Sequence, residues 1–582
     1  MTNRNSAYKP IPEQISKIVE THLNNPGSLL EVLFDLQKTP EGMTRDGIIN
    51  TARVLKIPAH RAFGIASFYS MLTFSAKKNT VRICDGPVCW LKHTGHNPFS
   101  FSDFLSNSAA SVPEGWQVER SSCLGMCDQA PAAMINSSEV GPFNTVEELY
   151  DPAFHWSKNL PDYSNPRKGE LRVMLQNSYR IDPEDIHSSL KFGAYQGLLS
   201  ALKSSPDEVI SLVEASGLQG RGGAGFPVGR KWRFVAQASK DPKYIVANAD
   251  ESEPLIFKDR ILMDTNPHQL LEGIAIAGYA CGAREAYIYI RGEYAKQADK
   301  LERAIQQAYA TGWLGDSIQN SGFSFRIHVH KGAGAYICGE ETALLESLEG
   351  KRGEPRLRPP YPPSYGYLGC PTAVNNIESL SVVPSILRNG VEWWKSLSPY
   401  PVAGTKIYMV LGHVNHPGIF EAPFGLTLRQ VVDDFGGGLL PGSQFNFALT
   451  GGAAGTIVNK DFLDIPLDYN SSQKGIGLGA GSFLICDQSV SLLGLLRELL
   501  HFFTIESCGK CTPCRVGTWR SYNLLAQMAD GQVVPTDINE LKALSENMFL
   551  ASFCGLGQSV AIPINSAISN FPGEFISPGK RE

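Results

Sequence analysis

Hydrophobic residues recur at two spacings along this chain, and the spacings predict where helices and strands form. Apolar residues three or four positions apart predict helices near both ends, at 15–22, 29–37, 44–55, 492–503, 517–528 and 537–549. Short apolar runs between turn residues predict strands at 80–83, 117–120, 132–136, 244–247, 286–290 and 325–329. Helices expected at 268–281 and 294–309 separate the central strands, as in a layered α/β domain.

The stretch from 399 to 486 has a different pattern, with short strands and many glycine turns around a single helix. Its strands are expected at 406–411, 418–421, 445–450 and 482–485, and its helix at 427–435. Prolines, asparagines and serines predict a linker at 151–175. We therefore expect a multidomain α/β protein with units at 1–150, 176–398, 399–486 and 487–582, the last of them a helix bundle.

Composition excludes several classes of function. The 582 residues are 43% hydrophobic and 19% charged, which is typical of a globular protein of several domains. A net charge of −5 gives no electrostatic footprint for nucleic acid. The first ten residues are polar and no apolar run is long enough to span a bilayer, so we expect a cytoplasmic protein. In that compartment the twelve cysteines favour metal ligands or reactive thiols over disulfides.

A glycine-rich run at Gly220–Pro227, followed by Lys231, is the strongest candidate for a ligand site. Four glycines in six positions let backbone N–H groups approach a ligand closely, and Arg221 and Lys231 favour a phosphate. The run follows a helix that begins with a capping box at Ser205 rather than a strand, which excludes a Rossmann fingerprint. No Gly-Lys-Ser/Thr follows as in a P-loop. The pattern predicts a phosphate or dinucleotide cradle of another kind, and a glycine-rich surface loop is the alternative.

One set of cysteines lies in the first 130 residues. Cys84 and Cys89 are spaced C-x4-C, Cys123 and Cys127 are spaced C-x3-C, and each pair follows a predicted strand. This arrangement suits four thiolates that converge on one site, and a structural zinc ion is one reading of such a set.

A second set of cysteines lies near the carboxyl terminus. Cys508, Cys511 and Cys514 follow C-x2-C-x2-C spacing at a helix connection, and Cys554 follows forty residues later at another. Three cysteines at this spacing favour one face of a [4Fe–4S] cubane over a zinc ion. The remaining cysteines stand alone, and we expect buried, unreactive thiols at Cys281, Cys338, Cys370 and Cys486.

Together these motifs resemble two subunits of respiratory complex I fused in one chain. The first cysteine set, with the preceding helices and Ala66–Ser70, resembles the thioredoxin-like [2Fe–2S] subunit. The rest resembles the flavin-binding NADH dehydrogenase subunit, through Gly220–Pro227, Asn248–Pro254, Gly332–Glu341, Pro355–Tyr361, Asn375-Asn376 and the second cysteine set. The resemblance covers about residues 10–570. It implies a thioredoxin-like domain, a flavin domain, a ubiquitin-like β-grasp insert of the soluble-ligand-binding type and a cluster-bearing helix bundle, in that order.

The resemblance also implies which residues hold the cofactors. FMN would be held by Gly220, Arg221, Gly222, Gly223, Lys231, Asn248, Asp250, Glu251, Tyr336, Gly339, Glu340, Glu341, Val374, Asn375, Asn376 and Ser379. NAD(H) would stack between the exposed flavin face and the aromatic rings of Phe226, Phe234 and Tyr361. It would also contact Glu253, Tyr336, Glu341 and Arg358, with Glu341 as the catalytic residue. The first cysteine set would hold the [2Fe–2S] cluster and the second the [4Fe–4S] cluster. The β-grasp insert shows no chemistry of its own.

The implied reaction is electron exchange between NAD(H) and iron–sulfur clusters through FMN, which takes up a hydride and passes electrons on singly. The fusion resembles the diaphorase subunit of NAD-reducing [NiFe] hydrogenases. That implies a hetero-oligomer with an iron–sulfur relay subunit and the hydrogenase small and large subunits. The alternatives are the NADH dehydrogenase module of complex I, an NAD-dependent formate dehydrogenase and a bifurcating hydrogenase, which usually has further cysteines not seen here. A non-catalytic iron–sulfur adaptor and a zinc-stabilised binding protein are alternatives of another class.

One segment departs from the family. Pro254-Leu255-Ile256 stands where Pro-Gly-Thr is more usual, so two bulky apolar residues replace a flexible turn. We expect a changed loop geometry beside the flavin but the same ligand.

Overall fold

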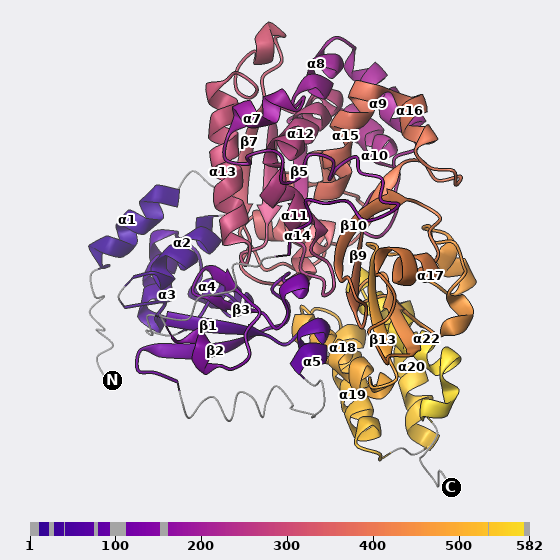
Figure 1. Ribbon diagram of the computed structural model, residues 1–582. Helices are drawn as coiled ribbons and strands as arrows, with labels where there is room; N and C mark the ends of the chain where they lie inside the picture. The colour runs from indigo at the N-terminus through magenta and orange to yellow at the C-terminus, as the bar shows by residue number, and fades with distance from the viewer. Residues whose placement is uncertain are drawn as a thin grey trace, which may run out of the picture.

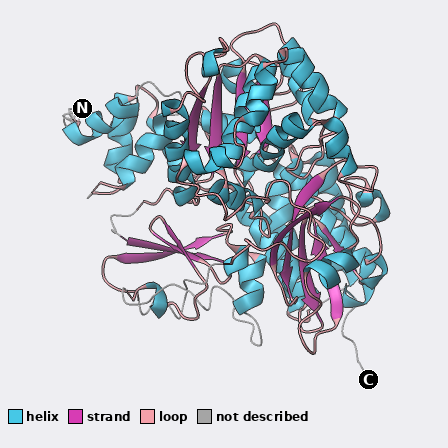
Figure 2. Ribbon diagram, turned by 45° about the horizontal axis from the view of Figure 1, so that its top comes forward, coloured by secondary structure: helices cyan, strands magenta, loops and turns pink. Residues whose placement is uncertain are grey.

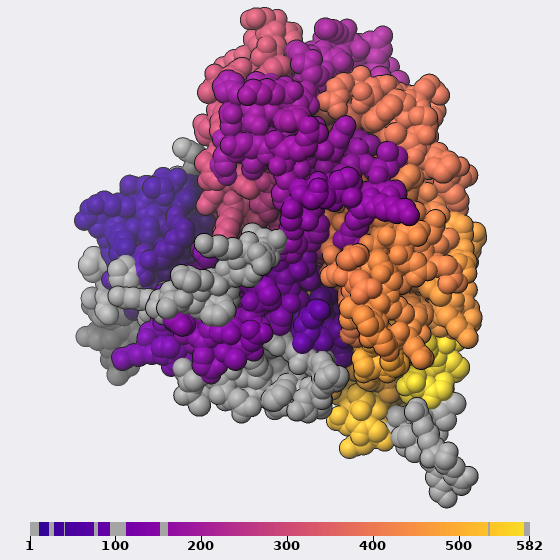
Figure 3. All heavy atoms as spheres, in the orientation of Figure 1, coloured from indigo at the N-terminus to yellow at the C-terminus, as the bar shows by residue number. Residues whose placement is uncertain are grey.

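The chain folds around three sheets that lie in separate regions of the molecule (Figure 1). The computed structural model describes residues 11–22, 28–39, 41–74, 79–93, 112–151, 161–532 and 535–575. The amino-terminal region, indigo and purple, forms a lobe to the left of the central region (Figure 3). The central region occupies the top of the view, and the β-rich and carboxyl-terminal regions, orange and yellow, lie at the lower right.

The amino-terminal region combines helices with a small mixed sheet. Its helices are α1 (Glu13–His22), α2 (Ser28–Gln37), α3 (Arg45–Val54), α4 (Ala59–Ala66) and α5 (Pro87–His93), with short 3-10 turns η1 (Cys127–Gln129) and η2 (Glu147–Leu149). The sheet order is β2-β1-β3-β4, from β1 (Asn79–Cys84), β2 (Trp116–Ser121), β3 (Ala133–Ile135) and β4 (Ser138–Val140). Because β1 and β2 are parallel and Cys84 pairs with Ser121, the loops with the first cysteine set leave the same edge of the sheet.

The central region is an α/β layer around a parallel sheet of order β7-β6-β5-β8. Its strands are β5 (Tyr244–Ala249), β6 (Glu285–Ile290), β7 (Arg326–Lys331) and β8 (Thr372–Asn376). Its helices are α7 (Ile186–Lys191), α8 (Gln196–Leu202), α9 (Pro206–Ala215), α10 (Val228–Gln237), α11 (Lys258–Thr265), α12 (Pro267–Cys281), α13 (Ala295–Ala310), α14 (Glu341–Leu348), α15 (Ile377–Asn389) and α16 (Val391–Ser396), with 3-10 turns η3 (Ile318–Asn320), η4 (Tyr336–Gly339) and η5 (Tyr367–Gly369). Figure 2 shows helices surrounding these strands, which is the covering that a parallel sheet needs.

The β-rich region is a mixed sheet of order β10-β9-β13-β11-β12. Its elements are β9 (Thr405–Gly412), β10 (Gly418–Pro423), α17 (Leu428–Gln430), the π-helical turn η6 (Val431–Phe435), β11 (Phe445–Thr450), β12 (Thr456–Val458), the 3-10 turns η7 (Lys460–Phe462) and η8 (Ser471–Lys474), and β13 (Ser482–Asp487). The rings of Phe420 and Phe435 stack with centroids 4.1 Å apart, so the short helix packs its apolar face on the sheet. This is the predicted β-grasp arrangement.

The carboxyl-terminal region is a helix bundle. It consists of α18 (Leu492–Glu506), α19 (Thr512–Ala529), α20 (Pro535–Ala551), α21 (Gly555–Ser559), α22 (Ala561–Asn570) and the 3-10 turn η9 (Pro572–Phe575). Leu495, Leu496, Leu499 and Phe503 of α18 are fully buried, at the spacing that predicted the helix. Within the described residues, no helix is long and apolar enough to cross a membrane.

The sequence pattern misses three short strands and several helices, α10 and α15 among them. The strands β4, β8 and β12 each have only three to five residues, too few for alternation to stand out. The helix α10 begins directly after the glycine run, with Pro227 as its N-cap, and includes Lys231. Residues 152–160 of the predicted linker lie outside the described residues. Its remainder is fastened to β10, where Glu421 accepts hydrogen bonds from the N–H groups of Val173, Met174 and Leu175.

Candidate flavin and iron–sulfur sites

The glycine run forms a narrow loop between α9 and α10. The N–H of Gly220 donates to the carbonyl of Phe226 at 2.9 Å, which closes the base of the loop. Gly225 has φ +67°, and a Cβ there would lie 2.7 Å from the ring of Tyr469, so only glycine fits. A Cβ on Gly222, by contrast, would meet Asn376 at an ordinary 3.5 Å. The space beside Gly222 is therefore not needed for packing within the protein, which suits a ligand cradle.

The polar residues predicted at the strand ends come together at the carboxyl edge of the central sheet. Asn248 of β5 pairs in register with Asn376 of β8. The Asn248 amide donates to the carbonyl of Gly339 at 2.9 Å, which ties β5 to the turn before α14. Asn375 accepts from the indole of Trp232 at 3.0 Å. This edge is where ligands of open α/β sheets bind.

A cluster of charged side chains borders the same edge. Lys231 reaches from α10 to the carbonyl of Val374 at 2.8 Å and to the carboxylate of Glu341 at 3.3 Å. Arg358 lies 3.6 Å from Glu341 and 3.5 Å from Glu340. Glu340 caps α14 by accepting the N–H of Thr342. Both glutamates are thus oriented by cations and by the helix N-terminus.

Arg221 and Tyr336 make contacts within the protein, and their predicted cofactor-binding roles stay predictions. The backbone N–H of Arg221 donates to Ser379 at 2.8 Å, but its buried guanidinium lies over the ring of Phe424 and donates to the carbonyl of Thr405. Its Nε and Nη1 have no hydrogen-bond partner among the described residues. The ring of Tyr336 packs against Phe502 of α18, with centroids 5.0 Å apart.

The predicted NAD(H)-stacking rings are exposed, as an approach surface requires. Phe226, Phe234 and Tyr361 are 43%, 45% and 56% exposed. Flat apolar rings left open beside a polar edge can stack on a nicotinamide or adenine. Arg230 lies over the ring of Phe234, and stacking of NAD(H) on these rings stays a prediction.

The β-grasp insert packs against the candidate flavin site through structural contacts, and the expectation that it contributes no chemistry of its own stays a prediction. Its loop supplies the N–H of Ala454, which donates to Glu253 at 3.2 Å. Its Tyr469 lies against Gly225, and Ala480 lies beside Gly223. No sequence motif announced these contacts, because they depend on how two regions pack.

Burial changes the charge of the acidic residues beside the cradle. It raises the pKa of Asp250 and of Glu251 to about 8 and the pKa of Glu253 to about 7. The protonated carboxyls are therefore well populated near neutral pH. A neutral carboxyl repels an anionic phosphate less than a carboxylate does, so this edge can accept a nucleotide.

The first cysteine set converges in the interior. Cys84 ends β1 and Cys89 lies on α5, and the thiol of Cys84 interacts with the thiols of Cys89 and Cys123. Cys123 also interacts with Cys127, and all of these thiols are buried. The neighbouring thiols, the Arg291 guanidinium and the N–H of Gly125 hold the pKa of Cys123 well below its usual range. Such a donor set fits a [2Fe–2S] cluster, since thiolates are its ligands.

Two buried arginines fasten the Cys123–Cys127 loop to the central region. Arg291 donates to the carbonyl of Cys123 at 2.5 Å and to that of Glu251 at 2.7 Å, and it pairs with Glu293. Arg260 donates to the carbonyl of Gly125 at 3.1 Å. A Cβ on Gly125 would lie 2.1 Å from the hydroxyl of Tyr294, so the loop fits closely against this region.

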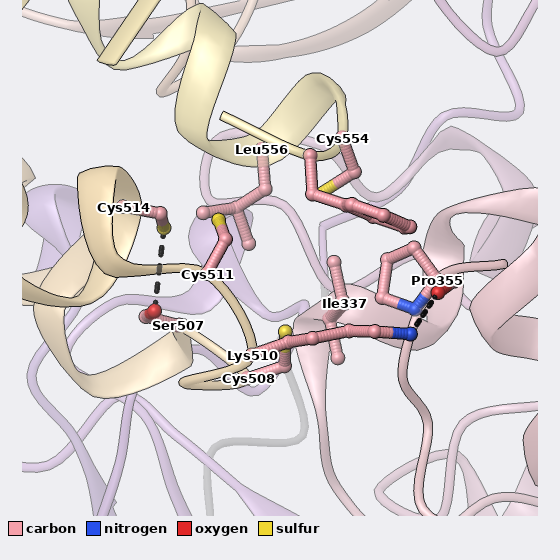
Figure 4. Close-up of a pocket in the computed structure, with 10 residues that line it drawn as sticks. Ile337, Pro355, Ser507, Cys508, Lys510, Cys511, Cys514, Cys554 and Leu556 are labelled. Atoms are coloured by element: carbon pink, nitrogen blue, oxygen red, sulfur yellow. Dashed lines mark hydrogen bonds between the residues drawn. The ribbon is translucent and has the colours of Figure 1, made fainter. Parts of the chain in front are cut away.

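The second cysteine set lines a pocket between the helix bundle and the central region. Figure 4 shows Cys508, Cys511, Cys514 and Cys554 around it, with Ile337 and Pro355 from the central region on the other side. Burial raises the pKa of Cys514 to about 12 and of Cys554 to about 11, so iron must displace protons here. A [4Fe–4S] cubane takes one thiolate at each iron, and these cysteines offer that number.

Sequence reasoning missed Glu506, a half-buried carboxylate just before Cys508. It accepts the N–H of Tyr336 at 2.8 Å and a short hydrogen bond from the hydroxyl of Ser122, the neighbour of Cys123. Glu506 thus connects both cysteine loops and the turn η4. The only signal in the sequence was a glutamate at the end of an apolar helix, where a cation is the expected residue.

Comparison with known proteins identifies the regions. Family models match as the thioredoxin-like [2Fe–2S] ferredoxin at 15–149, the Nuo51 FMN-binding domain at 213–385, the SLBB domain at 407–456 and the NADH-ubiquinone oxidoreductase-F iron–sulfur binding region at 494–577. These matches confirm the predicted fold class and the predicted FMN, [2Fe–2S] and [4Fe–4S] groups.

Individual relatives extend the comparison. The F 2 subunit of the NADH-quinone oxidoreductase of Rhizobium meliloti is 43% identical, over 70% of this chain and 97% of the relative. The HndC subunit of the NADP-reducing hydrogenase of Solidesulfovibrio fructosivorans is 42% identical, over 70% of this chain and 83% of the relative. A chain in the crystal structure of an NAD+-reducing [NiFe]-hydrogenase in the H2-reduced state matches with a TM-score of 0.81 and 30% identity, over 96% of this chain and 93% of that one.

Proposed function

We infer that this chain, which belongs to the family of the F-type subunits of NADH-quinone oxidoreductases, is the diaphorase subunit of an NAD-reducing [NiFe] hydrogenase. As a family member it is an oxidoreductase that binds NAD(H) and FMN and carries [2Fe–2S] and [4Fe–4S] clusters. The likeness to the hydrogenase chain, which extends over nearly all of this one, is the observation that carries the finer proposal. The net reaction is H2 + NAD+ = H+ + NADH.

The glycine run and the strand ends would hold FMN. Asn248 and Asn376 pair at the strand ends, and beside Gly222 and Asn376 the protein itself leaves a space open. The unpartnered Nε and Nη1 of Arg221 fit an anionic group nearby. When bound, FMN accepts a hydride and releases its electrons singly.

NAD(H) would approach across the exposed rings of Phe226, Phe234 and Tyr361. Glu341 is the residue that we expect to contact the reacting nicotinamide. Lys231 and Arg358 hold its carboxylate in place, so it is oriented before the ligand arrives. Arg358 is partly exposed and can turn to the dinucleotide phosphates.

The two clusters would differ in role. Cys508, Cys511, Cys514 and Cys554 would hold the [4Fe–4S] cluster that passes electrons onward. The buried cluster at Cys84, Cys89, Cys123 and Cys127 would lie off this route and store or tune electrons.

The surface near the second cysteine set supports a protein partner. Large apolar side chains stand exposed on α19, α20 and the segment before α21, namely Val516, Trp519, Phe549, Leu550 and Phe553. Exposed apolar residues grouped on the elements that carry ligand cysteines suit a docking partner that receives electrons. We propose that this partner is an iron–sulfur relay subunit, which connects the chain to the hydrogenase small and large subunits in a cytoplasmic hetero-oligomer.

A glycine replacement tests the flavin site directly. Gly222→Leu fills the cradle without a clash or backbone strain, so the protein should fold with its iron and sulfide intact but without flavin fluorescence after denaturation. NADH-driven dye reduction should be lost. Gly64→Leu is the control, because a side chain there meets nothing within 4 Å. Undiminished dye reduction by Gly222→Leu contradicts the proposal.

Co-purification tests the hydrogenase assignment. A complex that contains nickel and an iron–sulfur relay subunit is expected. Co-purification with quinone reductase subunits, or with a formate dehydrogenase, would contradict the hydrogenase assignment and favour the corresponding alternative. A flavin-free protein with both clusters would instead be an iron–sulfur adaptor.

A further inference from the structure

The segment Glu253–Ile256 forms a turn in which a leucine takes a conformation that favours glycine. The N–H of Ile256 donates to the carbonyl of Glu253 at 3.3 Å, Pro254 occupies the second position, and Leu255 the third, with φ +79°. These are the features of a type II turn, whose third position normally requires glycine. A leucine in this region of φ is strained, because its Cβ lies too close to the backbone. The surrounding structure must therefore hold Leu255 in place.

The turn contacts the first cysteine set through Leu255. The N–H of Leu255 donates to Sγ of Cys127 at 3.4 Å. Its side chain is 0% exposed, and Ile256 and Phe257 beside it are also buried. Leu255 thus keeps the backbone conformation of a glycine at the point where the central region touches a candidate cluster ligand.

The turn is fixed from the other side as well. Glu251 accepts the N–H groups of Asp259 and Arg260 at 2.8 and 3.0 Å. Arg260 in turn binds Asp128, the residue after Cys127, at 2.6 Å. Hydrogen bonds and an ion pair therefore fix the chain beside Leu255 and beside Cys127, so the contact between the Leu255 amide and the Cys127 sulfur is fixed as well.

We propose that Leu255 is a positioning residue of the [2Fe–2S] centre that sets its reduction potential. Its N–H stabilises negative charge on Cys127, and its buried side chain keeps water from that sulfur. Reduction adds negative charge to a cluster, so excluding water makes reduction harder, whereas the hydrogen bond makes it easier. The proposal rests on Cys127 being a cluster ligand, as the proposed function has it.

Redox titration of the holoprotein, monitored by EPR, tests this proposal. Leu255→Gly keeps the N–H and the left-handed backbone but removes the cover, so the cluster should become easier to reduce. The ratio of reduced to oxidised [2Fe–2S] at a fixed potential should rise about three- to tenfold. Ile256→Ala removes apolar volume from the same turn without altering the Leu255 amide and should leave the ratio unchanged. The [4Fe–4S] signal of each sample is an internal control.

A second measurement does not depend on how well Leu255→Gly folds. In protein labelled with 15N-leucine, pulsed EPR of the reduced [2Fe–2S] cluster should detect the amide nitrogen of residue 255. Leu255→Met conserves volume and should remove that coupling. An unchanged coupling in Leu255→Met, or equal redox shifts in Leu255→Gly and Ile256→Ala, overturns the proposal while the proposed function stands. A wild-type protein without any [2Fe–2S] signal would instead count against the proposed function.

Discussion

The two cysteine loops of this protein have opposite surroundings. The Cys123–Cys127 loop is buried, and Arg291, Arg260 and the Leu255 amide bind its backbone and sulfur. The Cys508–Cys514 loop has partly exposed cysteines, an exposed Arg515 and open apolar side chains on the adjoining helices. A loop fixed on all sides suits a cluster whose properties are set internally, and an open loop suits a cluster that meets a partner.

Replacing one arginine at each loop should give the largest contrast. Arg291→Met leaves Glu293 and two carbonyls buried without their partner, and we expect a loss of about 3–5 kcal/mol in the free energy of unfolding. Arg515→Met, at an exposed side chain bound to the carbonyl of Gly509, should lose less than about 1 kcal/mol. Denaturant unfolding measures both. Similar losses would mean that the two loops are equally fixed.

The second contrast is in the pH dependence of stability, which should be larger for a glutamate near the Cys123–Cys127 loop than for one in the helix bundle. Burial raises the pKa of Glu253 from an ordinary 4.5 to about 7, so the folded protein holds this proton more tightly than the unfolded chain. Its contribution is therefore fully present below about pH 4.5 and is lost as pH rises through 7, at about 1.4 kcal/mol per unit in between. Glu253→Gln should remove up to about 3 kcal/mol of this pH dependence, as measured by unfolding at pH 5 and 7.5.

The control for the pH prediction lies in the bundle. Glu540 is exposed, and its ion pair with Arg520 lowers its pKa. Its small contribution is present above about pH 4.5 and is lost as the medium is made more acidic. Glu540→Gln should therefore leave the interval from pH 5 to 7.5 unchanged. A change there as large as that of Glu253→Gln would contradict the assignment of the effect to burial.

A change on the apolar surface beside the Cys508–Cys514 loop should slow electron transfer to the partner subunit. Leu550 is 71% exposed on α20, and Leu550→Asp should slow reduction of the co-purified relay subunit about tenfold. NADH-driven dye reduction should stay the same, since the residue is remote from the cradle. Phe74→Asp, at a 50% exposed ring in the amino-terminal region, is the control. Equal slowing by both variants would place the partner elsewhere.

Local sequence patterns were sufficient to predict the cysteine sets and several of the helices in this comparison. Cysteine spacing predicted both sets, apolar periodicity predicted α18 and α19, and the capping box predicted the start of α9. The contacts that distinguish the loops were not predictable, because they join residues far apart in the chain. Arg291 meets Cys123, Leu255 meets Cys127, and Ala454 meets Glu253 only after the regions pack. The cofactor-binding roles of individual residues stay predictions until the variants are measured.

The smallest expected contrast concerns one hydroxyl at each loop. Ser122 donates to the half-buried Glu506, so Ser122→Ala removes one hydrogen bond of that carboxylate and should cost about 1 kcal/mol. Ser507 hydrogen-bonds to Cys514 and the N–H of Gly509 close by in the chain, and Ser507→Ala should cost less than about 0.5 kcal/mol. Paired unfolding curves resolve the difference, because both variants delete the same atom. Equal losses would show that a hydroxyl bridging two regions stabilises no more than one within a loop.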